Sequence, residues 1–220
     1  KGIWYTAQMQ KVLHTPELRS CVANVLSEFT HKNNVPGLNL DIEALAPGDK
    51  DVYVEFVQEL ATLLHTEHKF LTVDVPTRDE AFDLTYLGRA ADAVVLMAYD
   101  EHYPGGSPGP IASQNWFSDV VDETLAEVPQ NKLIVAFGNY GYDWNVESAS
   151  TANSLKFSEV MSLARDVEAQ PELSPDTRNM QFDYRDNNNR LHHVWFLNAA
   201  TVWNESVVLN QRDLLGYGLW

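Results

Sequence analysis

Apolar runs and helical patterns alternate along most of the chain. Five short and mostly apolar stretches predict strands, at residues 38–43, 70–75, 93–99, 132–138 and 216–220. Between them, apolar residues recur every three or four positions and predict helices over 15–32, 52–65, 80–89 and 116–125. This alternation is typical of parallel strands joined by right-handed crossovers. The pattern therefore predicts an α/β fold built on a parallel sheet.

The pattern changes near residue 145. A predicted helix over 155–167 leads to two alternating runs, 180–186 and 190–196, around an asparagine-rich turn. Two such runs around a turn indicate an antiparallel hairpin. We therefore expect residues 145–197 to form an insertion with a helix and a β-hairpin. A helix over 199–209 then restores the alternation.

The composition and the net charge indicate which kinds of molecule the protein could bind. The 220 residues are 45% hydrophobic and carry a formal charge of -16, which indicates a globular protein that repels nucleic acids, polyanions and anionic membranes. We expect a neutral substrate. The single cysteine excludes an internal disulfide framework and a cysteine-based zinc site. No apolar run approaches membrane-spanning length and no signal peptide is recognised, while the start at Lys1 makes us expect a fragment of a longer protein.

The stretch GLNLDIE at residues 37–43 carries the strongest chemical signal. In a strand, Asn39, Asp41 and Glu43 would share one face and the aliphatic residues the other. Two neighbouring carboxylates raise the pKa of the less solvated one, and a carboxyl that stays protonated can act as a general acid. A polar strand face that simply meets solvent is the alternative interpretation.

Aromatic and polar residues gather at the other predicted strand ends. They are Tyr99, Asp100, Tyr140, Tyr142, Trp144 and Trp220. In an α/β barrel, such residues at the carboxyl ends of strands indicate an active site. Sugar rings stack on aromatic side chains, and carboxylates beside them are typical of glycosidases. Trp195, on the predicted hairpin, is a further candidate sugar platform.

Four motifs in order resemble glycoside hydrolase family 18, the chitinase-like (β/α)8 barrels. They are GLNLDIE at 37–43, MAYD at 97–100, YGYDW at 140–144 and GYGLW at 216–220. The stretch 91–116 is most similar to the bacterial branch with spore-cortex-lysing enzymes and domains fused to polysaccharide deacetylases or glycosyltransferases. The resemblance implies one partial catalytic domain over 1–220, covering strands 4–8 of a TIM barrel. The first three strands would lie ahead of Lys1, and the hairpin insertion would lie between strands 7 and 8.

The resemblance also implies a mechanism. Glu43 would be the general acid and base, and Asp41 would hold and stabilise the 2-acetamido group of the substrate, whose oxygen attacks the anomeric carbon. Tyr99 would donate a hydrogen bond to that oxygen. The remaining sugar contacts would come from Asn39, Asp100, Tyr140, Tyr142, Trp144, Trp195 and Trp220. Family members often carry aspartate at the position of Asn39, and this departure could move the pH optimum.

The implied substrate is a β-linked N-acetylglucosamine polymer such as chitin, peptidoglycan or a related exopolysaccharide. No cofactor and no metal are expected, and the implied location is extracellular or in a bacterial cell envelope. Two other functions stay open. One is a chitinase-like carbohydrate-binding domain without activity, and the other is a non-catalytic part of a multidomain polysaccharide-processing protein. Such lectins usually lack the catalytic glutamate, so the presence of Glu43 favours the enzyme.

Overall fold

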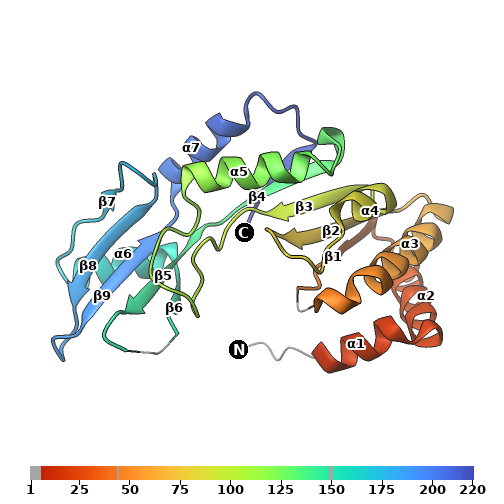
Figure 1. The fold of residues 1–220 in the computed structure, drawn as a ribbon, viewed down its shortest axis with the longest axis horizontal. Coiled ribbons are helices and arrows are strands. Elements are labelled where there is room, and N and C mark those ends of the chain that lie inside the picture. The colour runs from red at the N-terminus through yellow and green to blue at the C-terminus, as the bar shows by residue number, and fades with distance from the viewer. Residues whose placement is uncertain (1–5, 44, 149–150) are drawn as a thin grey trace. The chain divides into compact units, whose positions relative to one another are not determined.

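The computed structural model describes residues 6–43, 45–148 and 151–220, with two sheets and several helices (Figure 1). Residues 1–5, 44 and 149–150 belong to the predicted domain but lie outside the described residues. The chain divides into two compact units. Unit 1 comprises residues 1–97, 123–135 and 214–216, and unit 2 comprises residues 98–122, 136–213 and 217–220.

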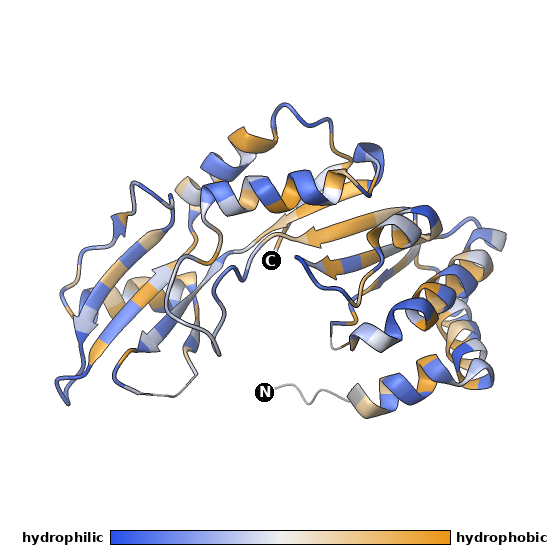
Figure 2. Ribbon diagram, in the orientation of Figure 1, coloured by the Kyte–Doolittle hydropathy of each residue, from blue (hydrophilic) through white to orange (hydrophobic). Residues whose placement is uncertain are grey.

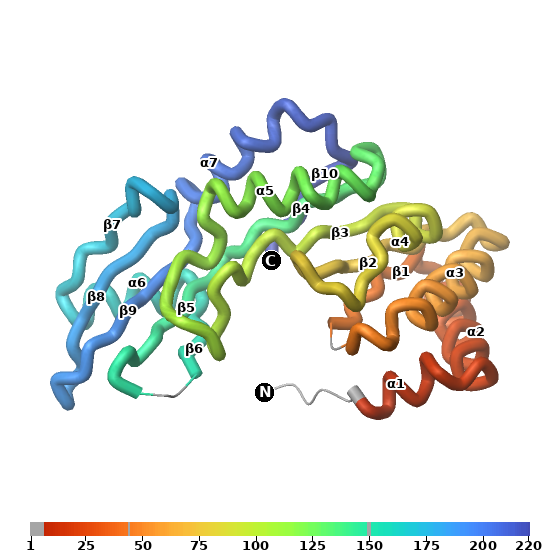
Figure 3. Tube along the Cα trace, viewed as in Figure 1, coloured from red at the N-terminus to blue at the C-terminus, as the bar shows by residue number. Residues whose placement is uncertain are grey.

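The first sheet contains the five strands that the apolar runs predict. They are β1 (Gly37–Leu40), β2 (Phe70–Pro76), β3 (Ala93–Met97), β4 (Leu133–Phe137) and β10 (Gly216–Leu219). Their order is β1-β2-β3-β4-β10, with β10 beside β4 (Figure 3), and both β1–β2 and β2–β3 are parallel. The predicted α/β class is confirmed. β1 ends three residues earlier than expected, at Leu40, because as an edge strand of this sheet it is held by β2 alone.

The α-helices that the described residues of unit 1 form precede or separate its strands. They are α1 (Thr6–His14), α2 (Pro16–Asn33), α3 (Lys50–Thr66) and α4 (Leu84–Ala90), with the 3-10 turns η1 (Pro47–Asp49) and η2 (Gln130–Lys132). α2 begins after an extended Thr15, whose side chain makes no capping bond, and Pro16 lies in its first turn. Asn34 caps the end of the helix, and its left-handed backbone (φ 51°) lets its N–H donate to the carbonyl groups of Thr30 and His31.

β2 separates the core of unit 1 from its polar face. Leu71, Val73 and Val75 are fully buried, and α3 packs against this strand. Thr72 and Asp74 alternate with them and therefore lie on the opposite face. β3 and β4 are almost continuously hydrophobic, as Figure 2 shows, which is typical of parallel strands buried on both faces.

The second sheet belongs to unit 2 and is antiparallel. Its strands are β5 (Tyr140–Asn145), β6 (Asn153–Lys156), β7 (Glu172–Leu173), β8 (Met180–Arg185) and β9 (Leu191–Phe196), in the order β6-β5-β9-β8-β7. The remaining helices are α5 (Gln114–Leu125), α6 (Phe157–Asp166) and α7 (Ala199–Leu209). Residues 140–144, expected at the end of the fourth parallel strand, instead open this sheet as β5. No described helix has both the length and the apolar character needed to cross a membrane.

The two faces of the second sheet differ. One face forms a hydrophobic core with α6, in which Val194 and Phe196 meet Val160 and Ala164. The other face carries Tyr142 and Trp195, because both alternate with core residues along β5 and β9. The alternation of hydrophobic and hydrophilic residues along β8 and β9 is visible in Figure 2. This second face holds most of the aromatic residues that the sequence singled out.

Candidate functional site

The carboxylates of the GLNLDIE motif lie at the carboxyl end of β1. Asp41 and Glu43 follow the last strand residue, and both are exposed, while Leu40 is buried. Asn39 is the preceding residue on the exposed side of the strand. The alternation of exposure continues past the strand, so these three polar residues are presented together. We call Asn39, Asp41, Glu43 and their neighbour Asp74 the acidic edge.

Asn39 links β1 to β2 through its side-chain amide. Its Nδ2 donates to Asp74 Oδ2 at 2.8 Å, and its Oδ1 accepts from the hydroxyl group of Thr72 at 2.6 Å. The strand register pairs Asn39 with Thr72 and Leu40 with Val73. One further step of the same register would bring Asp41 opposite Asp74, and the charge of Asp41 acts on Asp74. Both hydrogen-bonding ends of the amide are therefore used, and they hold it in one orientation.

Asp74 carries the main electrostatic signal of the acidic edge. Burial raises the pKa of its carboxyl group, the charge of Asp41 raises the pKa further, and the Asn39 amide offsets part of this rise. Tyr53 of α3 lies beneath, fully buried, and the charges of Asp74 and Asp41 add to the effect of burial in raising its pKa. Its hydroxyl group has no hydrogen-bond partner among the described residues. Burial and the neighbouring charge therefore favour the protonated forms of the Asp74 carboxyl group and the Tyr53 hydroxyl group.

Sequence reasoning missed Asp74 as a site residue. The strand prediction included it, and its place beside buried Val73 and Val75 indicated a polar face. Only the register between β1 and β2 connects it with Asn39, and that register joins residues 35 positions apart in the chain.

A second cluster forms in unit 2 around Asp100. The hydroxyl groups of Tyr140 and Tyr142 both donate to Asp100 Oδ1, at 2.5 and 2.8 Å. Burial and the charge of Asp100 raise the pKa of both tyrosines, so both remain hydrogen-bond donors. Asp100 has a left-handed backbone (φ 64°), which aspartate adopts more readily than most residues. We call Asp100, Tyr140 and Tyr142 the tyrosine–aspartate cluster.

Aromatic rings extend this cluster on both sides. Tyr99 meets Tyr140 edge to face at 5.9 Å, and Tyr142 meets Trp144 in the same way at 5.4 Å. Trp144 is only 3% exposed, and its indole N–H lacks a hydrogen-bond partner within the described ranges. Trp195 is the cross-strand neighbour of Tyr142. These contacts join Tyr99 and four of the predicted substrate contacts, Tyr140, Tyr142, Trp144 and Trp195, in one aromatic group.

The predicted site residues therefore fall into two groups. Asn39, Asp41 and Glu43 belong to unit 1, and the tyrosine–aspartate cluster, Tyr99, Trp144, Trp195 and Trp220 belong to unit 2. Trp220 follows β10, is 70% exposed, and donates its backbone N–H to the carbonyl oxygen of Phe137. Each group is consistent with its expected chemistry, since one collects carboxylates and the other collects aromatic rings and hydroxyl groups.

The hairpin histidines have internal roles. His192 is buried, with Nδ1 2.7 Å from Asp143 Oδ1, and the hydroxyl group of Tyr184 donates to the other oxygen of Asp143 at 2.9 Å. His193 lies on the opposite face, with Nδ1 2.6 Å from Asp183 Oδ1.

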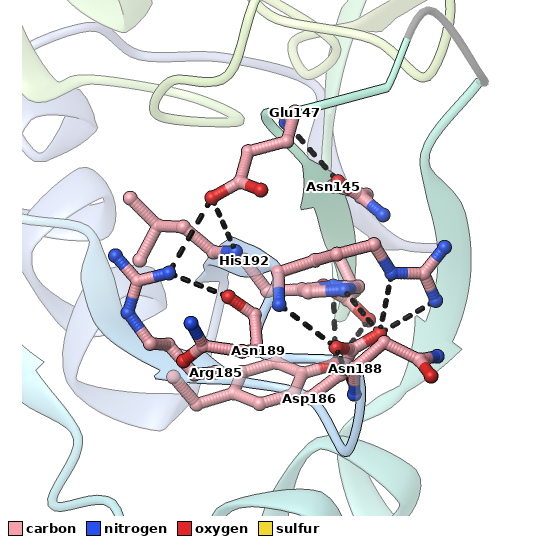
Figure 4. A network of polar contacts seen from close by, with 11 residues as sticks. Asn145, Glu147, Arg185, Asp186, Asn188, Asn189 and His192 are labelled. Carbon is pink, nitrogen blue, oxygen red and sulfur yellow. Dashed lines mark hydrogen bonds and ion pairs between the residues drawn. The ribbon is translucent and has the colours of Figure 1, made fainter.

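Figure 4 shows the turn of the hairpin beyond these histidines. There the carboxylate of Asp186 accepts hydrogen bonds from the backbone N–H groups of Asn188 and Arg190. Arg185 donates to Glu147 and to the carbonyl oxygen of Asn189. The carboxylate of Asp186 is therefore already hydrogen-bonded by N–H groups of its own turn.

The family model for glycosyl hydrolases family 18 matches residues 3–220. The uncharacterized glycosylase YvbX of Bacillus subtilis is 29% identical over 96% of this chain and 64% of its own length, and the cortical fragment-lytic enzyme of the same organism is 25% identical over 95% and 51%. The chain thus spans half to two thirds of these relatives. A crystal structure of a chitinase from Chromobacterium violaceum superimposes with a TM-score of 0.91 and 30% identity, covering all of this chain and 71% of that one. The chain belongs to glycosyl hydrolases family 18.

Proposed function

We propose that this protein is a retaining glycosidase that cleaves β-linked N-acetylglucosamine polymers. Glu43 gives a proton to the departing glycosidic oxygen while the substrate's 2-acetamido oxygen forms a bond to the anomeric carbon. Asp41 accepts the acetamido N–H and stabilises the cationic oxazolinium. Water then attacks the anomeric carbon and gives its proton to Glu43. The two displacements leave the anomeric configuration unchanged.

The observation that carries the proposal is the acidic edge. Asp41 and Glu43 follow the carboxyl end of a parallel strand, where α/β barrels hold their catalytic groups. Burial and the charge of Asp41 raise the pKa of Asp74, so the surroundings of the acidic pair favour a protonated carboxyl group. A general acid requires such an environment.

Unit 2 supports a sugar-binding role. Tyr99 would donate to the acetamido oxygen, and Asp100 would orient the sugar with help from its two tyrosines. Trp195 offers a half-buried ring, and Trp220, with 70% of its surface exposed, would be the floor beneath the reacting sugar. Trp144, expected as a sugar contact, is only 3% exposed and presents no ring face for stacking. Asn39 would contribute through its contact with Asp74.

We further propose that the first sheet is the part of a (β/α)8 barrel that comprises strands 4–8. The second sheet and α6 would then be an insertion between the last two barrel strands. The names of the relatives favour a chitin-like polymer or the glycan of peptidoglycan. A location outside the cell or in the cell envelope follows from such a substrate, and fusion to deacetylase or glycosyltransferase domains is compatible with it.

The test compares the protein with its Glu43→Gln variant on chitooligosaccharides and on peptidoglycan. Loss of the general acid should lower kcat about 10²–10⁴-fold, with KM changed little. Asp51→Asn removes a carboxylate from the exposed first turn of α3 and is the matched control. NMR of the first product should show the β-anomer. Equal turnover by the protein and the Glu43→Gln variant would exclude the mechanism.

A carbohydrate-binding function without hydrolysis is the second candidate. The accessible rings of Trp195 and Trp220 favour it, because stacking alone can hold a sugar chain. Calorimetric binding of chitooligosaccharides without any turnover would support this candidate over the enzyme.

A further inference from the structure

Asp74 lies beside the proposed catalytic acids but on a different strand. The amide of Asn39 donates to its Oδ2 at 2.8 Å, and the charge of Asp41 acts on it directly. The carboxyl group is half-buried, so solvent screens that charge only partly. A group with these contacts can influence both the position and the protonation of its neighbours.

We propose that Asp74 is a positioning residue for the acidic pair of this chain, acting through Asn39 and through its own charge. This inference rests on the proposed function and assigns a role within the same site. Asn39 cannot turn without losing its bond to Thr72 or its bond to Asp74. Asp74 therefore holds the side chain of Asn39 in place, and Asp41 lies two residues further along the same polar side of the chain.

The groups around Asp74 are neutral or negatively charged. β1 contributes the neutral amide of Asn39 and the like charge of Asp41, and α3 contributes the neutral hydroxyl group of Tyr53. On the other side, β3 places Val95 opposite Asp74 in the register. No cation among the described residues forms an ion pair with Asp74, so an ionised Asp74 opposes further negative charge nearby. The negative charge of Asp41 therefore favours the protonated form of Asp74.

Asp74→Asn tests the charge separately from the hydrogen bond. The new amide oxygen can still accept from Asn39, so the geometry should persist while one negative charge disappears. The remaining carboxyl groups then lose their protons more readily, and the pH profile of kcat/KM should move about 0.5–1 unit toward acid. At pH 7 we expect about a three- to tenfold loss of kcat/KM, since one pKa unit is tenfold in protonation.

The exchange variant Asn39→Asp with Asp74→Asn tests the position. It keeps one carboxylate, one amide and the bond between them, with the donor and the acceptor reversed. We expect it to recover most of the activity and the pH profile that Asp74→Asn loses. Asn39→Asp alone places two carboxylates face to face and should move the profile toward alkaline pH. Asp51→Asn remains the control, with an unchanged profile.

A readout without activity separates this inference from the proposed function. Carbon NMR of the side-chain carboxyl groups should show Asp74 titrating above the usual range for aspartate, and Asp41→Asn should lower that midpoint. If the protein cleaves no glycan, the titration still decides the inference. An Asp74 that titrates normally and ignores Asp41→Asn overturns it, as does an active protein in which Asp74→Asn leaves the pH profile unchanged. If Asp74→Asn does not fold, the titration in the Asp41→Asn variant gives the same decision.

Discussion

The acidic edge of unit 1 and the tyrosine–aspartate cluster of unit 2 surround a carboxylate with different numbers of hydrogen-bond donors. In the acidic edge, Asp74 has one amide donor and a charged neighbour, Asp41, and its pKa is raised. In the cluster, Asp100 receives two tyrosine hydroxyl groups at one oxygen. The first arrangement favours the protonated form of Asp74, and the second uses Asp100 as the hydrogen-bond acceptor of two tyrosines. The difference shows that the donors around a carboxylate, more than the residue type, decide what it can do.

Glu205 of α7 extends the comparison to an acid without donors, and it gives the largest expected effect. It is 1% exposed, neither oxygen has a hydrogen-bond partner among the described residues, and burial raises its pKa to about 9. The folded state therefore holds a proton that the unfolded chain releases near pH 4.5. The stabilisation is complete below pH 4.5 and is lost as the pH rises toward 9, by about 1.4 kcal/mol per unit.

Urea unfolding at several pH values measures this loss. The free energy of unfolding should fall by about 2–3 kcal/mol between pH 5 and pH 7 through this group, and Glu205→Gln should remove that slope. Glu172→Gln, at an exposed position of β7, should leave the slope as it is. A Glu205→Gln variant with the full slope would contradict the assignment of the effect to this residue.

Removing the acceptor of the tyrosine–aspartate cluster should have an intermediate effect. Asp100→Ala leaves the hydroxyl group of Tyr142, a residue only 6% exposed, without its acceptor and places alanine in a left-handed backbone. We expect a loss of about 1–2 kcal/mol in the free energy of unfolding. Asp100→Asn is the control, because asparagine tolerates this backbone and its oxygen still accepts. Equal losses in the two variants would mean that the tyrosines do not depend on this acceptor.

The smallest effect is expected at Asp49, a buried carboxylate of unit 1 that has ample donors. Burial would raise its pKa, but the backbone N–H of Ala46 and the side chains of His14 and Gln10 together lower it. Its contribution is therefore present above pH 3.8 and is lost as the pH falls through the lowered value. Asp49→Asn should cost only about 0.5–1 kcal/mol at pH 6, because His14 is half exposed.

Thermal unfolding at pH 6 and at pH 3 measures this cost, and the variant and the unchanged protein should converge at the lower pH. A difference in stability between the two proteins that grows toward acid would show that the surroundings of Asp49 raise its pKa, and would contradict the comparison with Asp74 and Glu205.

Hydrophobic periodicity predicted the parallel sheet well, because each of its strands is a local apolar run. It predicted α3 for the same reason, through Phe56, Leu60 and Leu64, which are buried on one side. β5 could not be separated from the preceding strand. Both of its faces are covered, so Tyr142, Asp143 and Trp144 are all buried and burial does not alternate along the strand.

The candidate site was predictable only where its residues are neighbours in the chain. Asp41 and Glu43 follow one strand, and Tyr140, Tyr142 and Trp144 alternate along another, so each set was visible as a motif. The bond from the Asn39 amide to Asp74 and the two tyrosine bonds to Asp100 join residues 35 to 42 positions apart. Such contacts depend on strand register and on the path of the loops, which no local pattern contains.

The parallel register of β1 and β2 also constrains how this chain can change over evolutionary time. Because Asn39 and Asp74 are donor and acceptor of one bond, a mutation at either position alters the value of the residue at the other. Substitution of the asparagine by an acid should be tolerated mainly in lineages that have already lost the acid on β2. Positions 39 and 74 should therefore covary among family members, with a single carboxylate conserved across the pair even where its location switches strands.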